Sequence, residues 1–377
     1  MQFAHLADSH LGACAYRKIS NSGYNQREED VCTSFEKAVD KIIELKPDFV
    51  LHAGDLFDSA RPTNRIISFA LKQIGRLLAE NINVVIISGN HDTPKQRYIG
   101  SVFQIFERID PQKKLLRVIY NDEYSPVEFG NAVIHCVPQC STDEIFKVQL
   151  NNIKKDAKKK NILMLHAGIT GMKAFSHGDS NELLLDVAYL EKNKFDYVAL
   201  GHYHNFVEVA ENAYFSGSTE RMSFNEAYVD FKGFIMVDLS EKTKIRQVSV
   251  DTRKMIDMLI SCGSKDSVLI SSEIEEKMKK ADINDKIVRL TVKDIPSHIL
   301  AALDIKKIRE LGAPATHFEP IFEKLNEGGS PVTIKSSIGN ISDEFKLFIE
   351  GYSGMSKEDK NIYLDEGLKA INEISIP

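Results

Sequence analysis

Aspartate, asparagine and histidine residues follow directly on short apolar stretches at several points in the chain. In one of them, residues 49–58, a run of Phe, Val and Leu breaks at Gly54, and Asp55 comes next. Short apolar runs of this kind are typical of buried strands. Ligands bind at the carboxyl ends of the strands in an open α/β sheet, so these polar side chains are predicted to meet at one edge. The others that end such stretches are Asp8, His10, Asn90, His91, His166, His202 and His204.

Carboxylates and imidazoles gathered in this way suit the hydrolysis of a phosphodiester. That reaction needs a nucleophile at neutral pH and a means of absorbing charge on the phosphate oxygens. Two metal ions roughly 3.5–4 Å apart supply both. Asp55 is predicted to bridge the ions because it ends the central strand. Asp8 and His10 lie two positions apart, as do His202 and His204, so each pair is expected on one side of an extended segment.

The order of these motifs, D-x-H, G-D, G-N-H-D, H and G-H-x-H, resembles that of the calcineurin-like metallophosphoesterases. Each motif is weak alone, and their shared order makes the resemblance specific. Several details resemble one branch of the family, the SbcD-type double-strand-break repair nucleases, over roughly the first two thirds of the chain. They are D-S-H-L-G at 8–12, G-D-L-F-D at 54–58, A-L-G-H-Y-H at 199–204 and S-G-S-T-E at 216–220.

The resemblance implies which residues hold each ion. Imidazole and oxygen ligands without a thiolate suit manganese or iron better than a structural zinc. The family favours two manganese ions, with magnesium, iron and zinc as the weaker alternatives. The set implied for the first ion is Asp8, His10, Asp55 and His204, and the set for the second is Asp55, Asn90, His166 and His202.

His91 follows a ligand position but is not itself expected to be a ligand. Its predicted role is general acid toward the leaving oxygen, or stabilisation of the phosphate. Asp58 is predicted to bond the far ring nitrogen of His91 and so fix its tautomer. Some close relatives carry a second histidine where this chain has Asp58. The pair of His91 and Asp58 is therefore expected to replace a second catalytic histidine.

Composition limits the class of protein only loosely. A chain of 377 residues is long enough for one large domain and a smaller one. The net charge of -6 gives no global signal for nucleic acid, so a DNA-binding surface must be a local basic patch. The 5 cysteines favour isolated reduced thiols and a cytoplasmic location. No apolar run is long enough to span a bilayer and no secretory signal is recognised, so no membrane association is expected.

The alternation of strands and helices over 1–250 predicts a nuclease domain, a four-layer α/β/β/α sandwich. Helices are expected at 30–46, 62–80 and 99–109, and the strands within 115–137 and 206–250 are expected in the second sheet. The helices at 62–80 and 99–109 carry more apolar residues than one sheet face needs. Either a thick core or a subunit interface explains this, and the interface resembles the helical homodimer contact of SbcD-type proteins. The lysine-rich run 154–160 is predicted on a polar helix, more as a solvated face than as a phosphate site.

The pattern changes near residue 251. Residues 251–327 read as a β-α-β-α-β unit without metal motifs, which resembles the small α+β capping domain that helps to admit DNA ends. Residues 328–341 are predicted to be a linker, and 342–377 a helical tail of two amphipathic helices. Two helices bury little by themselves, so docking on a partner is preferred to folding back on the chain. By resemblance the partner is an SMC-like coiled-coil ATPase of the SbcC type.

The leading hypothesis is a manganese-dependent DNA nuclease that acts as an exonuclease at double-strand ends and as an endonuclease on single-strand DNA. One rival is another calcineurin-like enzyme, a phosphoprotein phosphatase or a small phosphodiesterase. The phosphatase signature expects Arg directly after the second Asp, whereas Ser59 stands there. The other rival is an inactive scaffold subunit, which would tolerate missing ligands, yet every expected ligand type is present.

Overall fold

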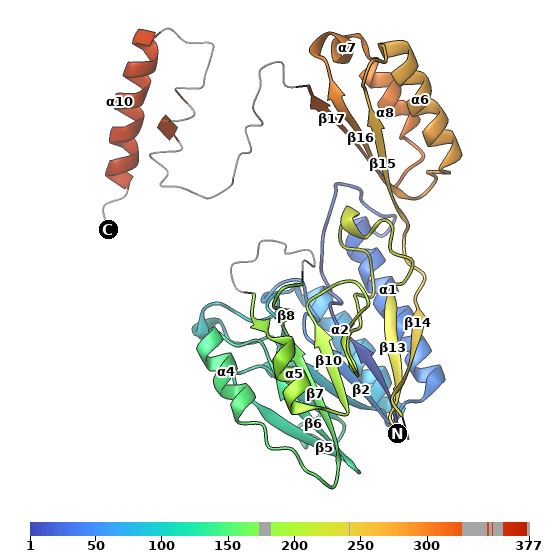
Figure 1. Ribbon diagram of the computed structural model, residues 1–377, viewed down its shortest axis with the longest axis vertical. Coiled ribbons are helices and arrows are strands. Elements are labelled where there is room, and N and C mark those ends of the chain that lie inside the picture. Colours follow the sequence, from blue (N-terminus) through green and yellow to red (C-terminus); the bar gives the residue numbers. More distant parts are fainter. Residues whose placement is uncertain (173–181, 241, 326–344, 347–348, 350–356, 375–377) are drawn as a thin grey trace. The chain divides into compact units, whose positions relative to one another are not determined.

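The computed structural model describes residues 1–172, 182–240, 242–325, 345–346, 349 and 357–374 (Figure 1). The chain forms two compact units, Met1–Leu325 and Asn326–Pro377. The first unit contains two six-stranded sheets and a separate three-stranded sheet. No helix among the described residues is both long and apolar enough to cross a bilayer.

The first sheet has the strand order β14-β13-β1-β2-β3-β4. Strands β1 to β4 run parallel, so their carboxyl ends meet at one edge, and β13 pairs antiparallel with β1. Their bounds are β1 Gln2–Leu6, β2 Phe49–Ala53, β3 Asn83–Ile87, β4 Leu116–Ile119, β13 Gly233–Asp238 and β14 Lys244–Ser249. The expectation that β4, β13 and β14 lie in the second sheet is therefore wrong. Apolar alternation reveals a strand but not the sheet in which it pairs.

The second sheet has the order β11-β12-β10-β7-β6-β5. Strands β6, β7, β10 and β12 are parallel to one another. The bounds are β5 Ser125–Phe129, β6 Ala132–Val137, β7 Lys160–His166, β10 Tyr197–Gly201, β11 Val207–Ala210 and β12 Ala213–Phe215. A short parallel pair, β8 Gly168–Ile169 and β9 Leu184–Leu185, lies beyond β7.

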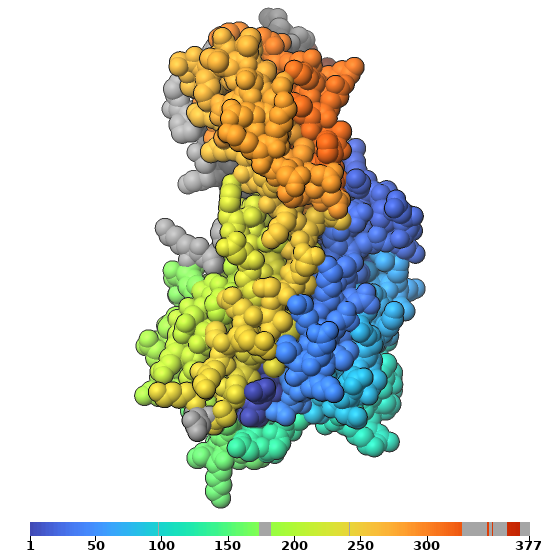
Figure 2. Space-filling view, turned by 90° about the vertical axis from the view of Figure 1, so that its right-hand side faces the viewer, coloured from blue at the N-terminus to red at the C-terminus, as the bar shows by residue number. Residues whose placement is uncertain are grey.

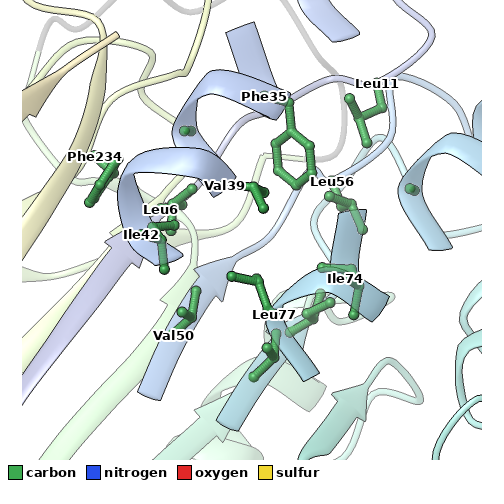
Figure 3. Close-up of a cluster of buried hydrophobic side chains, with 14 of the residues drawn as sticks. Leu6, Leu11, Phe35, Val39, Ile42, Val50, Leu56, Ile74, Leu77 and Phe234 are labelled. Carbon is green, nitrogen blue, oxygen red and sulfur yellow. The ribbon is translucent and has the colours of Figure 1, made fainter. Parts of the chain in front are cut away.

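The two sheets pack face to face through a buried apolar layer. Phe3 of the first sheet stacks on Phe49 at 4.8 Å between ring centroids and meets Tyr197 of the second sheet edge-on at 5.2 Å. Helices α1 (Gln26–Leu45) and α2 (Asn64–Ala79) cover the outer face of the first sheet, as Figure 3 shows for the residues around Phe35 and Leu77. Helices α4 (Asp143–Asn151) and α5 (Val187–Asn193) cover the second. The α/β/β/α sandwich is confirmed.

The helix starts follow their caps. Helix α1 begins earlier than predicted because the Asn25 side chain accepts hydrogen bonds from the backbone N–H groups of Arg27 and Glu28.

The helix predicted at 99–109 is wrong over most of its length. A 3-10 turn, η1, covers Arg97–Ile99, and α3 spans only Phe103–Phe106. Gly100 separates them with a φ of 72°, which no right-handed helix contains.

The excess apolar residues on α2 and α3 are partly explained by the core. Leu77 is 2% exposed and Phe103 is fully buried, where its ring packs on Phe57 and Phe106. At these two positions the apolar residues therefore belong to the core and not to an exposed interface. Ile105 and Ile109 remain exposed at 43% and 39%.

The lysine-rich run does not lie on a helix. Helix α4 ends at Asn151, and Lys160 is the first residue of β7. Lys159 pairs with Glu128 and Lys160 with Asp196. Since β7 ends at His166, the run lies at the opposite end of the strand from the predicted metal ligands. The predicted helix is therefore wrong, and the preferred interpretation as a solvated face stays a prediction.

Residues 255–324 form a three-stranded parallel sheet with helices, here called the module. Its order is β15-β16-β17, with bounds β15 Met255–Ser261, β16 Ile287–Ile295 and β17 His317–Lys324. The helices are α6 Ser267–Lys280, α7 Ser297–Ala302 and α8 Ile305–Leu311, of which α7 was not predicted. The module has its own apolar core, and its helices have the orange tones of Figures 1 and 2.

The second unit contributes α10 (Lys357–Ile374), whose start matches the second helix predicted in the tail. Phe345 lies against this helix, since a Cβ added at Gly367 would stand 2.2 Å from the Phe345 ring. The predicted linker 328–341 lies outside the described residues, and so does Phe348, an apolar residue of the first helix predicted in the tail.

Candidate active site

The predicted site residues converge at one edge of the two six-stranded sheets. Each follows the carboxyl end of a parallel strand, β1, β2 and β3 from the first sheet and β7 and β10 from the second. The residues brought together are Asp8, His10, Asp55, Asp58, Asn90, His91, His166, His202 and His204.

The backbone at this edge is strained. Asp8, His10 and Asp55 have φ values of 53°, 46° and 52°, and His202 has 113°. Non-glycine residues rarely adopt positive φ, and such strain persists where the surrounding structure fixes it. The strand ends are therefore bent to aim these side chains at a common point.

Glycine is required where the loops approach one another. A Cβ at Gly54 would stand 2.3 Å from His166 Nδ1, and a Cβ at Gly89 would stand 2.2 Å from Asp55 Oδ1. No side chain fits at either distance. Gly54 and Gly89, from the G-D and G-N-H-D motifs, thus allow His166 and Asp55 to approach the neighbouring loops closely.

Asp8, His10 and His204 form one group of donor atoms that all lie within 4.8 Å of one another. His10 Nε2 is 3.1 Å from His204 Nε2 and 3.8 Å from Asp55 Oδ2. These residues are the four implied for the first ion.

Asp55 Oδ2 also lies 3.2 Å from His166 Nε2. Asn90 Oδ1 lies 3.0 Å from the same nitrogen and 3.3 Å from His202 Nδ1. These are the four residues implied for the second ion, and the His202 ring also meets the His166 ring edge-on at 5.4 Å between centroids. Asp55 thus reaches both groups, and Asp8 also lies within 4.8 Å of a ring nitrogen of His166.

The donor set fits divalent metal ions. Asp58 and Glu226 carboxylates lie 3.2 Å from the Nδ1 atoms of His10 and His204. Protons on both Nδ1 atoms leave two Nε2 lone pairs facing each other at 3.1 Å, an arrangement that a cation between them stabilises. Only imidazole, carboxylate and amide atoms take part, which suits manganese or iron.

Every histidine of the site has an oxygen acceptor for its outer nitrogen. His166 Nδ1 lies 2.9 Å from the Ala53 carbonyl oxygen, and His202 Nε2 lies 3.1 Å from Glu182 Oε1. Glu182 and Glu226 were missed by sequence reasoning. Neither belongs to a strand-end motif, so no signal in the sequence marked them.

The predicted contact between the Asp58 carboxylate and His91 is at ion-pair distance and is not a hydrogen bond. The carboxylate bonds His10 Nδ1 at 3.2 Å, and it is 3.9 Å from His91 Nδ1. His91 Nδ1 lies instead 3.1 Å from the backbone carbonyl of Asp58. Asp58 therefore orients both rings, one through its side chain and one through its backbone.

His91 lies at the wall of a pocket and not among the buried ligands. Its backbone N–H donates to Asp55 Oδ1 at 2.9 Å, and its side chain is 34% exposed. The pocket has a volume of about 330 Å³ and is also lined by His10, His204 and Met222. The imidazole can thus meet a bound molecule beside the ligand groups.

Burial and pairing shift the protonation of the central residues in opposite directions. Burial raises the pKa of Asp55, but attraction to His166 outweighs it and leaves that pKa well below its usual range. Burial lowers the pKa of His166, but attraction to Asp55 outweighs burial and raises that pKa to about 9. Burial alone is the main cause that lowers the pKa of His202 to about 3. Of the two rings, His202 is therefore the harder to protonate.

Two arginines near the loops of the site are held by other side chains. Arg27 is 4% exposed and bonds Asp30 at 2.7 Å. Arg65 pairs with Glu28 at 2.5 Å and lies over the Tyr24 ring. Neither guanidinium is available as a simple surface contact for phosphate.

Comparison with known proteins places the chain among named relatives. The family model described as calcineurin-like phosphoesterase matches residues 1–206. The DNA double-strand break repair protein Mre11 of Methanocaldococcus jannaschii is 32% identical over 276 residues, which cover 69% of each chain. The protein of the same name from Methanococcus maripaludis is 33% identical over 68% of each chain. That from Sulfolobus acidocaldarius is 27% identical over 97% of this chain and 94% of its own.

Proposed function

The chain belongs to the calcineurin-like phosphoesterase family, in its Mre11 branch, and from that premise we propose that it is a manganese-dependent DNA nuclease. The observation that carries the proposal is the position of Asp55. Its carboxylate lies 3.2 Å from His166 and 3.8 Å from His10, so it reaches both ligand groups. A carboxylate in that place is suited to bridge two ions.

The proposed ligands are those implied by the motifs. Asp8, His10, Asp55 and His204 hold one manganese ion, and Asp55, Asn90, His166 and His202 hold the other. The family implies divalent metal ions, and the lack of thiolates in both groups supports manganese over a structural zinc. When bound, the ions supply a nucleophile at neutral pH and absorb charge on the phosphate oxygens.

His91 is proposed as the general acid. Its ring stands at the wall of the pocket, and its Nδ1 bonds the Asp58 carbonyl. With the Nδ1 proton bonded to that carbonyl, Nε2 is the nitrogen that would carry the second proton of the doubly protonated ring and give it to the leaving oxygen, or donate to the phosphate. Asp58 supports this role through its backbone, and its carboxylate supports His10.

We propose that the substrate is DNA, cleaved as an exonuclease at double-strand ends and as an endonuclease on single strands. The Sulfolobus relative aligns over nearly the whole chain, including the module, and it is named for double-strand break repair. A phosphoprotein phosphatase or small phosphodiesterase has no need of the module. An inactive scaffold is disfavoured because every ligand position is occupied by a side chain able to bind.

Cleavage assays test the proposal. The purified chain should cut linear duplex DNA from its ends and nick circular single-strand DNA with manganese, but not with a chelator. Hydrolysis of a phosphopeptide or a small phosphodiester without cleavage of DNA would favour the first rival. No hydrolysis of any of these substrates in manganese would favour the scaffold.

Three further features belong to the same proposal. Residues 1–250 are the nuclease domain and 251–327 the capping domain that admits DNA ends. The chain forms a homodimer, for which the exposed Ile105 and Ile109 offer apolar surface. Its location is the cytoplasm. Sedimentation tests the dimer: an Ile105→Asp variant should be monomeric and folded, while a monomeric wild type contradicts the proposal.

The tail at 342–377 is proposed to bind an SMC-like coiled-coil ATPase. Truncation at Gly339 should leave manganese-dependent cleavage of simple DNA within about twofold of the intact chain, since no site residue lies beyond it. Co-purification with the ATPase, and stimulation by ATP, should be lost. If truncation lowers the melting temperature and leaves partner binding intact, the helices only stabilise their own chain.

A further inference from the structure

His204 is held at two separate points. Its ring Nδ1 lies 3.2 Å from Glu226 Oε1. Its backbone carbonyl accepts from Lys232 Nζ at 2.7 Å and from the backbone N–H of Ser218 at 3.0 Å. His10 is held in a similar way, by Asp58 at its ring Nδ1 and by the Ala13 backbone N–H at its carbonyl, but no buried lysine of the described part of the chain takes part there. Ser218 belongs to the S-G-S-T-E motif, to which the catalytic scheme above gives no role.

The holding residues form one buried network. Glu226 is 3% exposed, Lys232 2% and Ser218 0%. Lys232 donates to Glu226 Oε2 and, at 2.9 Å, to Ser218 Oγ. A buried ion pair adds little to stability once the loss of hydration is counted, and apolar residues of similar size often replace one without loss. Stability alone therefore does not account for a lysine and a glutamate in this place.

We propose that Glu226, Lys232 and Ser218 form a clamp that positions His204 as a ligand of the first manganese ion. This inference rests on the proposed function. The Glu226 carboxylate keeps a proton on Nδ1, so that Nε2 presents its lone pair toward His10 Nε2, 3.1 Å away. Lys232 and Ser218 hold the backbone from which the ring projects. The three are positioning residues and touch no reacting atom.

The clamp also rests on the module. Glu226 lies in the 3-10 turn η2, Phe224–Glu226. Phe224 packs with Met255 and Ile287 of the module, and the Arg289 guanidinium lies 4.5 Å over its ring. Two residues after Glu226, the Tyr228 hydroxyl donates to the Asp257 carbonyl at 2.5 Å. The module thus supports the turn that orients His204, besides any role in admitting DNA.

Two double variants isolate the hydrogen bond. Glu226→Leu with Lys232→Met removes the acceptor and leaves no unpaired buried charge. Glu226→Gln with Lys232→Met differs only in restoring an acceptor oxygen at position 226. Calorimetric titration of the metal-free full chain with manganese should show one of two sites weakened about 10- to 100-fold in the first variant. In the second, affinity should return to within about threefold of a Lys232→Met single variant.

Equal affinity in the two double variants would overturn the proposal, because the acceptor would then have no effect. A matched control is Glu220→Gln. Glu220 is another fully buried carboxylate close by, bonded to Ser34 at 2.6 Å and to no site histidine. Its loss should lower the melting temperature and leave both manganese affinities unchanged. Weakened binding in the control would mean that burial, and not the contact with His204, matters.

One measurement needs no variant. Ring nitrogen chemical shifts of His204 in the metal-free wild type should report a proton on Nδ1 and none on Nε2. The opposite tautomer would overturn the proposal even if a double variant fails to fold.

His204→Ala separates this inference from the function on which it rests. If that variant binds two manganese ions as tightly as the wild type, the ligand assignment is wrong. If His204→Ala loses one ion while the double variant Glu226→Leu with Lys232→Met loses none, the ligand assignment holds and only the clamp is wrong.

Discussion

The site edge of the two large sheets and the interior of the three-stranded module are built from opposite kinds of residue. At the site edge, the carboxylates of Asp8 and Asp55 and the ring of His166 are at most 2% exposed. The module interior is apolar, and its fully buried residues include Ile270, Ile274, Val288, Leu290 and Val292. Burying charged groups costs free energy unless they are paired, whereas burying apolar surface stabilises the fold.

The two regions also differ in how they are joined. Tyr16, in the loop after His10, stacks on His317 of the module at 3.7 Å. Arg253, just before the module, forms a double hydrogen bond with Asp30 of α1 at 2.7 and 2.8 Å. The site buries charged groups, which costs free energy, and a loop and a helix beside it contact the apolar module.

The largest effect is expected from the substitution of Asp55, the residue proposed to bridge the two ions. Asp55→Ala should lower cleavage of every DNA substrate by about 10³-fold or more, because the Asp55 carboxylate lies 3.2 Å from His166 in one ligand group and 3.8 Å from His10 in the other. Manganese binding should fall at both sites in the same titration. The matched control is Asp266→Ala, which removes the cap of α6 in the module and should cost only about 1 kcal/mol of stability. Wild-type cleavage by Asp55→Ala would show that it does not bridge.

The next effect separates chemistry from metal binding. His91→Ala should slow cleavage by about 10²–10⁴-fold, the usual contribution of a general acid, while two manganese ions remain bound. Elemental analysis beside a cleavage assay measures both. The exposed His298 of the module provides the control, since His298→Ala should change neither. Loss of the metals, or normal cleavage, would contradict the role of His91.

A substitution in the apolar core of the module tests whether the stability of the module can change without a change in metal binding at the site. Leu290→Ala should destabilise the protein by about 2–5 kcal/mol, because Leu290 is fully buried among apolar neighbours. Urea unfolding measures this change. The manganese affinity of the folded fraction should stay as in the wild type, because no ligand touches Leu290. A change in affinity without a change in stability would mean that the two regions are not distinct in this way.

The smallest effect concerns the contact between the regions. Burial raises the pKa of Asp30, but hydrogen bonds from Arg253 and attraction to Arg27 leave it below its ordinary value of 3.8. A lowered folded-state pKa gives stability that is present above pH 3.8 and is lost as pH falls through the folded pKa. Asp30→Asn should remove roughly 1–3 kcal/mol at neutral pH and flatten this acid dependence. Denaturation at several pH values measures it, and an unchanged acid dependence would rule out Asp30 as its source.

Much of the site was predictable because its signals are local in sequence. A ligand that directly follows an apolar strand is carried to the strand's carboxyl end whichever sheet the strand joins. Asp8, Asp55 and His166 were therefore placed correctly without knowledge of the strand order. The strands and two of the three helices of the module were predicted for the same reason, since their apolar spacing and turns lie within short segments.

Tertiary structure decided every feature that depends on which segments return to one another. The pairing of β13 with β1, rather than with the second sheet, is made by residues more than 200 positions apart in sequence. The Asp58 carboxylate bonds His10 and not His91 because the bent end of β1 brings His10 within 3.2 Å. Glu226 reaches His204 across a separation of 22 residues through a turn held by the module. Such contacts depend on the path of the loops in space, and a single sequence does not encode that path in any local pattern.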